Sequence, residues 1–170
     1  MLVQTYGTVN FQTDIQRGKI GEAIFIDDFL KFLRINYEDV TGVQGFQVID
    51  SDFLAKIGRY EIKANYKDDK MLVIEEFTNI NESIAPKSFG WFYKSRADVL
   101  VFISKATRAM VIVPFTDEFK AHYEAVKSKY ALRWNEISVH NGRRWQSAYR
   151  KVPLDDLVGY FAYYKKVQHG

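Results

Sequence analysis

The segment from Asp50 to Asn65 reads DSDFLAKIGRYEIKAN and predicts a β-hairpin. A short apolar run, Phe46 to Ile49, precedes it, and a second run, Tyr60 to Ala64, follows a turn that carries a glycine. Two such runs joined by a glycine-bearing turn are typical of antiparallel strands. Glu61 and Lys63 are two residues apart in the second strand, so we expect both side chains on one face of the sheet.

This hairpin places two carboxylates and an amine close together. Asp52, near the end of the first run, and Glu61 supply oxygen ligands, and Mg²⁺ binds through one or two carboxylates while keeping waters and a phosphate. Lys63 can orient or activate an attacking water, or stabilise charge that builds on the phosphate. A Glu-X-Lys triplet alone is also compatible with a solvated surface pair worth less than ~1 kcal/mol. The interpretation therefore depends on the rest of the chain.

Asp52 and the tripeptide Glu61-Ile62-Lys63 resemble the motif of the PD-(D/E)XK nuclease superfamily, in which (D/E)-X-K follows an acidic residue on the next strand. The resemblance implies an α/β fold with a restriction endonuclease-like core, a central mixed β-sheet flanked by helices in the order αβββαβ. It also implies a Mg²⁺ (or Mn²⁺) site formed by Asp52, Glu61 and the main-chain carbonyl of Ile62. In that arrangement Lys63 assists the attacking water, and the product carries a 5′-phosphate.

The match departs from the motif at one position, because Ser51 stands where the superfamily often has proline. Asp50 is a rival for the first acidic role. Asp52-Phe53-Leu54 is similar to the D-F-hydrophobic step common in the superfamily, which favours Asp52.

The first predicted element is a helix over residues 17–33, with Asp14 as its N-cap. Its apolar stripe includes Ile26 and Phe29, and Glu22 lies on the same face, four and seven residues earlier. A carboxylate facing a core is costly unless it is paired or metal-bound, although one in the first turn of a helix can reach solvent. Many members of the resembled superfamily carry a glutamate here that completes the acidic cluster, which assigns Glu22 to the catalytic and metal-binding group.

Later elements follow from the same patterns. Residues 71–74 predict a third strand in the antiparallel sheet. Glu75 and Glu76 follow it and are candidates for a further metal ligand; the alternative is that one of them faces solvent or pairs with a basic residue. Apolar runs predict buried strands, polar caps and periodicity predict helices, and an Asn-Gly pair predicts a hairpin. The expected segments are strands at 99–103 and 109–113, helices at 88–94, 115–134 and 153–164, and a hairpin over 137–152.

Positive charge is concentrated in the last third of the chain. Residues 120–170 hold 10 Lys and Arg against 4 Asp and Glu, while the whole chain has a net charge of +3. Basic residues that alternate with aromatic ones suit contacts with phosphates and stacking on unpaired nucleobases. A strand of this composition is equally compatible with a solvated sheet edge that is protected by charge. The residues predicted to contact DNA are Lys94, Arg96, Arg143, Arg144, Trp145, Arg150 and Lys151. The segment that contains Lys94 and Arg96 resembles one in small phage and bacterial nucleases, which implies that both side chains lie near the substrate. The alternative is that its aromatic residues belong to the core and its basic side chains are solvated.

Composition excludes several classes of protein. The chain has 170 residues, enough for one domain with a real core. It lacks cysteine, so disulfides and thiolate zinc sites are excluded, and its three histidines have no paired spacing. No signal peptide, membrane span or nucleotide-binding glycine motif is found. We expect a cytoplasmic single domain over residues 1–170, with a core at about 17–113 and substrate-binding additions at about 114–170.

The resulting hypothesis is a metal-dependent endodeoxyribonuclease of bacterial or phage type that hydrolyses phosphodiester bonds. Small chains of this superfamily with a basic C-terminal region include Holliday junction resolvases, so branched DNA and a homodimer are the expected substrate and assembly, with no membrane partner or nucleotide cofactor. The alternatives are a restriction-type or nonspecific DNA nuclease, and a non-catalytic DNA-binding module of the same fold.

Overall fold

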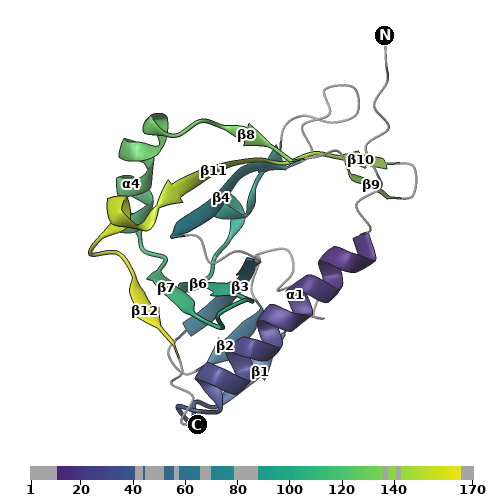
Figure 1. The fold of residues 1–170 in the computed structure, drawn as a ribbon, viewed down its shortest axis with the longest axis vertical. Helices are drawn as coiled ribbons and strands as arrows, with labels where there is room; N and C mark the ends of the chain where they lie inside the picture. The colour runs from purple at the N-terminus through teal and green to yellow at the C-terminus, as the bar shows by residue number, and fades with distance from the viewer. Residues whose placement is uncertain are drawn as a thin grey trace.

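In the part of the chain that the structure describes, a six-stranded sheet, a four-stranded sheet and a two-stranded ribbon lie together with several helices (Figure 1). The computed structural model describes residues 11–40, 44, 52–55, 58–65, 70–78, 88–135, 138–140 and 143–165. A six-stranded mixed sheet carries the long helix α1 along one face, and a four-stranded antiparallel sheet lies on the side of the other face, with the helix α4 beside it. Within the described segments, no helix is long and apolar enough to cross a membrane.

Helix α1 begins earlier than the sequence predicts. It spans Phe11–Phe25 and continues as a π-helical segment, η1, over Ile26–Leu30. The expected N-cap, Asp14, therefore lies inside the helix, which corrects that prediction. The helix starts at Phe11, six residues before the predicted start at residue 17, so Glu22 lies well inside the element and away from its first turn.

The π-helical segment changes which residues face the core. The Lys31 amide donates to the Ile26 carbonyl at 2.8 Å, which closes a five-residue turn and inserts one residue into the helical register. The later residues are rotated as a result: Leu30 is buried, whereas Leu33 is exposed. Asp28 is buried too, and its carboxylate accepts from Arg108 Nε at 2.5 Å.

The six-stranded sheet has the order β1-β2-β3-β6-β7-β12. Its strands are β1 (Tyr37–Asp39), β2 (Phe53–Ala55), β3 (Gly58–Asn65), β6 (Val99–Ser104), β7 (Met110–Pro114) and β12 (Ala162–Tyr164). All neighbours are antiparallel except β3 and β6, which run parallel. The predicted hairpin is confirmed in part: its second strand is β3, and the strand that pairs with it is β2 at Phe53–Ala55. The two strands predicted at residues 99–103 and 109–113 are confirmed as β6 and β7. The expected strand over residues 46–49 lies outside the described residues.

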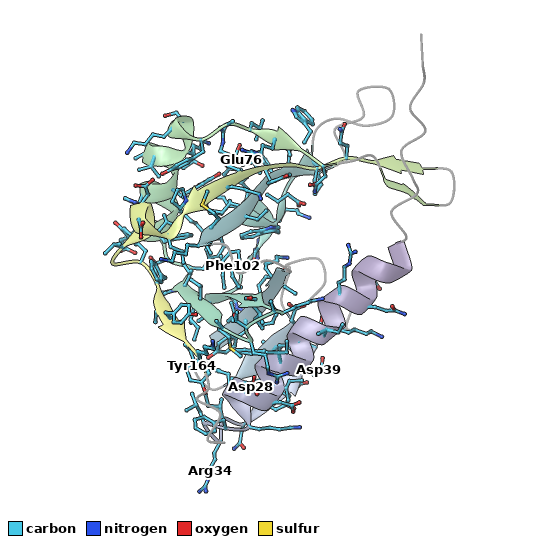
Figure 2. The ribbon with its side chains drawn as sticks, viewed as in Figure 1. Asp28, Arg34, Asp39, Glu76, Phe102 and Tyr164 are labelled. Carbon is cyan, nitrogen blue, oxygen red and sulfur yellow. The ribbon has the colours of Figure 1, made fainter. Side chains whose placement is uncertain are left out.

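The two faces of this sheet bury different side chains. Ile62, Val101 and Ile103 belong to a core cluster that also contains Ile24 and Phe25 of α1. Alternate residues point the other way, so Leu100 and Phe102 join a second cluster. That cluster reaches Leu72 and Ile74 of the other sheet and Phe119 and Tyr123 of α4, and Figure 2 shows Phe102 between the two sheets.

The four-stranded sheet has the order β5-β4-β11-β8. Its strands are β5 (Ser88–Phe89), β4 (Met71–Thr78), β11 (Ala148–Pro153) and β8 (Arg133–Trp134). The strand predicted at 71–74 exists as β4, but it does not join the hairpin as expected. The parallel strand β6 occupies the second edge of β3, so β4 pairs with β5 and β11.

The predicted C-terminal hairpin is confirmed in part. Strands β9 (Ser138–His140) and β10 (Arg143–Trp145) pair as a two-stranded ribbon. The returning strand does not run on to residue 152, because residues 146–147 are bonded to Asn135: the Asn135 amide donates to the Ser147 carbonyl at 2.9 Å. The chain then enters the other sheet as β11.

The remaining helices are shorter than predicted. They are α3 (Trp91–Lys94), α4 (Asp117–Val126) and the 3-10 turns η2 (Lys127–Lys129) and η3 (Leu154–Leu157). Thr116 caps α4, its hydroxyl accepting from the Phe119 amide at 3.2 Å. The predicted last helix is wrong: η3 ends at Leu157 because Val158 has a ψ of 132°, and after Gly159, which has a φ of 93°, the chain forms β12.

The order of elements around the hairpin gives the fold class. Helix α1, the antiparallel strands β1, β2 and β3, the short helix α3 and the parallel strand β6 follow one another, with β4 and β5 inserted into the second sheet. The fold is therefore mixed α/β with a mixed multi-stranded sheet.

Candidate active site at the end of strand β2

Asp52 lies where β2 separates from β3. Its amide donates to the Tyr60 carbonyl at 2.8 Å, and its Oδ2 accepts from the Ile62 amide at 2.7 Å. The carboxylate thus takes the ladder position that a backbone carbonyl of β2 would otherwise occupy. The N–H and C=O of one residue point to the same side of an extended strand, so the Ile62 carbonyl is directed to the same edge as Asp52.

Glu61 and Lys63 project from the face of β3 opposite Ile62. Their carboxylate and ammonium groups form an ion pair, which the two-residue spacing predicts. The Glu61 side chain is buried, whereas 29% of the Lys63 side chain is exposed. Lys63 Nζ also lies 5.2 Å from the centroid of the Trp91 ring, within cation–π range. A buried carboxylate next to a solvent-accessible ammonium can interact with a ligand that enters from the Lys63 side.

Glu22 reaches this region from α1. A Cβ built on Gly21 would lie 2.6 Å from the Ala64 Cβ, so only glycine lets the helix approach β3 this closely. The neighbouring Glu22 is half-buried. Burial raises its pKa, and the carboxylates of Asp52 and Asp39 raise the pKa further, while Lys19 lowers it. Glu22 and Asp52 therefore lie close enough to repel each other, as the acids of a cation-binding site do.

The donor set fits a divalent cation of the Mg²⁺ class. Among the residues placed in the structure, no group of three or more His, Cys, Asp and Glu side chains is arranged to hold a metal. Mg²⁺ does not require such a group, since one or two carboxylates with waters and a phosphate complete its octahedron. The carboxylates of Glu22 and Asp52 and the carbonyl of Ile62 are the oxygen donors that could hold such a cation.

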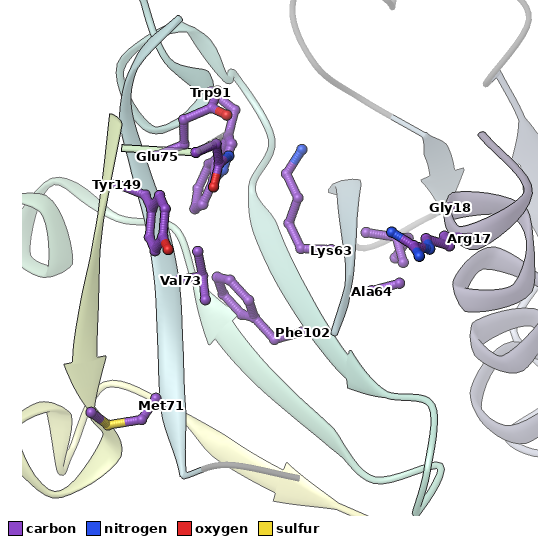
Figure 3. A pocket seen from close by; sticks show the side chains of 12 residues that line it. Arg17, Gly18, Lys63, Ala64, Met71, Val73, Glu75, Trp91, Phe102 and Tyr149 are labelled. Atoms are coloured by element: carbon purple, nitrogen blue, oxygen red, sulfur yellow. The ribbon is translucent and has the colours of Figure 1, made fainter. Parts of the chain in front are cut away.

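A cleft of about 460 Å³ borders Lys63 (Figure 3). It lies between the amino-terminal half of α1, strand β3 and the facing side of the four-stranded sheet. Figure 3 shows Lys63 between Trp91 and Glu75 on one side and Arg17 and Gly18 of α1 on the other. Its walls are formed by Arg17, Gly18, Ile62, Lys63, Ala64, Met71, Val73, Glu75, Trp91, Phe102, Asn135 and Tyr149.

Glu75 and Glu76 are adjacent on β4 and face opposite sides of the strand. Glu76 faces α4 and pairs with Arg150 at 2.8 Å, so for this residue the predicted pairing with a base is confirmed. Glu75 faces the cleft. Burial raises its pKa, while hydrogen bonds from the Ser147 hydroxyl and the Trp91 amide and the charges of Lys63 and Lys94 oppose that rise. Glu75 is thus an acid within the electrostatic reach of Lys63.

The predicted DNA contacts lie in different places. Lys94 and Arg96 are exposed, and Lys151 is half-buried. Arg150 keeps 17% of its side chain exposed, but alternation along β11 turns it towards α4, where it pairs with Glu76 and donates to the Tyr130 carbonyl. The side chains of Arg143, Arg144 and Trp145 and the rival acid Asp50 lie outside what the structure describes.

Sequence reasoning did not identify three of the cleft residues. Tyr149 lies opposite Glu75 in the β4–β11 register, so their side chains share the cleft face. The period-two pattern of β11 predicts which of its residues share a face with Tyr149, but it does not predict that β4 is the neighbouring strand. Arg17 and Asn135 carry no local signal, because helix packing and the loop before β9 place them.

No protein-family model, curated protein sequence or solved structure matches this chain. The functional assignment therefore rests on the site itself.

Proposed function

We propose that this protein is a Mg²⁺-dependent DNA endonuclease that hydrolyses phosphodiester bonds. The observation that supports this most strongly is the Asp52 carboxylate on the Ile62 amide, beside the Glu61–Lys63 pair. That contact brings the acid before the hairpin and the Glu-X-Lys tripeptide to one point of the sheet. The succession of α1, the β1–β2–β3 meander and the parallel strand β6 is further support, because it follows the αβββαβ order of restriction endonuclease-like cores.

In this proposal each residue has a separate task. Asp52, Glu61, the Ile62 carbonyl and, directly or through water, Glu22 would hold the cation, which supplies charge stabilisation at the phosphate and a more acidic water. Lys63 orients the attacking water and stabilises charge on the non-bridging oxygens. Water adds to phosphorus as the bond to the 3′ oxygen breaks, and the proton passes to that oxygen, which leaves a 5′-phosphate.

Within this class we propose a branched substrate and a homodimer. A two-fold dimer presents two sites to the opposed strands of a four-way junction. The basic ribbon of β9 and β10 carries Arg143 and Arg144 in its sequence, and phosphate contacts recognise shape without reading bases. Replacing both arginines should weaken junction binding and reduce its salt slope by about one unit for each phosphate contact.

The test is a cleavage panel of linear, single-stranded, flap and four-way DNA with Mg²⁺. We expect cleavage of the four-way substrate by wild type and none by Asp52→Asn. Mg²⁺ should also raise the melting temperature of wild type through linkage, and Asp52→Asn should remove that shift. No cleavage of any substrate, with a melting curve independent of Mg²⁺, would contradict the proposal. A competition in Ca²⁺ in which linear duplex equals the junction would leave a restriction-type or nonspecific nuclease.

A further inference from the structure

The cleft beside Lys63 has the composition of a site for a flat, partly polar ligand. Tyr149 and Phe102 supply ring surfaces, and Met71 and Val73 supply aliphatic surface. The volume of about 460 Å³ lies in the roughly 300–1,000 Å³ range of sites that enclose small organic groups. A cleft of this size can hold one nucleotide with its base exposed to the walls, but not a base pair inside a duplex.

A connected row of polar groups runs along one wall. The Asn135 side-chain amide donates to the Ser147 hydroxyl at 2.7 Å, and Ser147 in turn hydrogen-bonds the Glu75 carboxyl group. Asn135 and Glu75 both line the cleft. Side-chain amides and carboxyls are the groups that pair with the hydrogen-bonding edges of bases. This wall can therefore bind the edge of a base whose face lies against Tyr149.

Basic groups stand at the side of the cleft nearest the proposed site. Lys63 and Arg17 both line it, from β3 and from α1 respectively. A nucleotide that places its base against the sheet wall would direct its phosphate towards these two cations. Aromatic walls next to a basic track are the arrangement that binds single-stranded nucleic acid.

We propose that the cleft binds an unstacked nucleotide next to the cleaved phosphate, so that the protein acts on DNA with unpaired bases and not on fully paired duplex. This inference rests on the proposed function for the identity of the neighbouring phosphate. It narrows the substrate to flaps, bubbles and opened branch points, because enzymes reach the face of a base only outside the stack.

The test measures binding in Ca²⁺ to two DNA probes of the same sequence, one fully paired and one with a central unpaired thymine segment. We expect wild type to prefer the opened probe by roughly 5- to 150-fold, the equivalent of stacking one base. Tyr149→Ala should reduce this preference at least several-fold. Tyr163→Ala is the matched control, because Tyr163 is 58% exposed on β12 and does not line the cleft.

A second variant tests the cleft by filling it. Val73→Trp places a ring in the cleft from β4, a strand position that accepts aromatic residues, and should abolish the preference. Val158→Trp, at a 72% exposed position outside the cleft, should leave it unchanged. Thermal melting of all four variants verifies folding.

The outcomes separate this inference from the proposed nuclease function. Equal binding of the two probes by wild type, or an unchanged preference in both Tyr149→Ala and Val73→Trp, would overturn the cleft assignment even if Mg²⁺-dependent cleavage is observed. A preference for the opened probe that both variants lose would support it even if no cleavage occurs, and in that case only the nuclease proposal fails.

Discussion

Two carboxylate–cation pairs, Glu61–Lys63 and Glu76–Arg150, differ in their surroundings. Glu76 is 2% exposed beneath α4, and its Oε1 accepts from both Arg150 at 2.8 Å and the Tyr123 hydroxyl at 2.6 Å. Glu61 is equally buried, but its partner Lys63 borders a cleft. Figure 2 shows Glu76 on the four-stranded sheet, away from the α1 side of the molecule. The Glu76–Arg150 pair is therefore structural, because α4 covers it. The Glu61–Lys63 pair is accessible to a ligand, because Lys63 borders the cleft.

The electrostatic neighbours sharpen this difference. Tyr123 donates to Glu76, and burial raises the pKa of the Tyr123 hydroxyl well above its usual value of 10.0. Asp52 accepts from the Ile62 amide but also lies near another acid, and burial together with the Asp52 charge raises the pKa of Glu22. Hydrogen-bond donors around a carboxylate stabilise the folded state. Repulsion between acids instead raises the free energy of the folded state, and binding of a cation or a proton relieves that repulsion.

The largest expected effect is on stability at Glu76. Glu76→Ala should lower the free energy of unfolding by about 3–5 kcal/mol, because it leaves the charge of Arg150, whose side chain is only 17% exposed, without its carboxylate partner. Glu61→Ala should cost less, since Lys63 reaches solvent. Urea unfolding of the two variants measures this, and Glu76→Met with Arg150→Met should recover part of the loss. Equal costs for Glu76→Ala and Glu61→Ala would remove the distinction between the two pairs.

The next effect is on rate and concerns Lys63. Lys63→Ala should lower cleavage by at least ~10²-fold, the scale of losing a group that assists the reacting water or stabilises charge. Affinity for DNA should change little, because one charge is a small part of the phosphate footprint. Single-turnover cleavage and binding in Ca²⁺ separate the two quantities, and Lys120→Ala on α4 is the control. A parallel loss of rate and affinity would make Lys63 a contact residue only.

The smallest effect is a pH dependence at Glu22. Its folded pKa is raised above 4.5, so its contribution to stability is present below pH 4.5 and is lost as the pH rises through the folded pKa. Glu22→Gln should therefore be more stable than wild type at neutral pH, by at most about 1 kcal/mol after solvent screening. The two unfolding curves should converge below pH 4.5. Measurement from acid to neutral pH without divalent cations tests this.

Glu118 provides the control of opposite sign. Its own amide and the Thr116 hydroxyl lower its pKa at the start of α4. The stability that it contributes is present above pH 4.5 and lost on acidification through the lower folded pKa, so Glu118→Gln should be less stable than wild type at neutral pH. The same sign for both variants would argue against repulsion at Glu22.

Local patterns in the sequence determined strand β3 and the turn before it, the shared face of Glu61 and Lys63, and the apolar strands β6 and β7. These features depend on residues a few positions apart, where side-chain period and turn chemistry act directly. Glu22 was identified from its place on the apolar helix face and from the family resemblance, not from any contact visible in the sequence.

Only the tertiary structure decided which edges the strands occupy. Strand β4 has the pattern of a third hairpin strand, but the long-range parallel strand β6 takes the edge of β3 and leaves β4 to pair with β11. That choice turns Arg150 inward and Tyr149 towards Lys63, and so forms the cleft. Strand pairing is decided by which distant segment completes the hydrogen bonds and buries the most apolar surface, and a single run of residues does not carry that information.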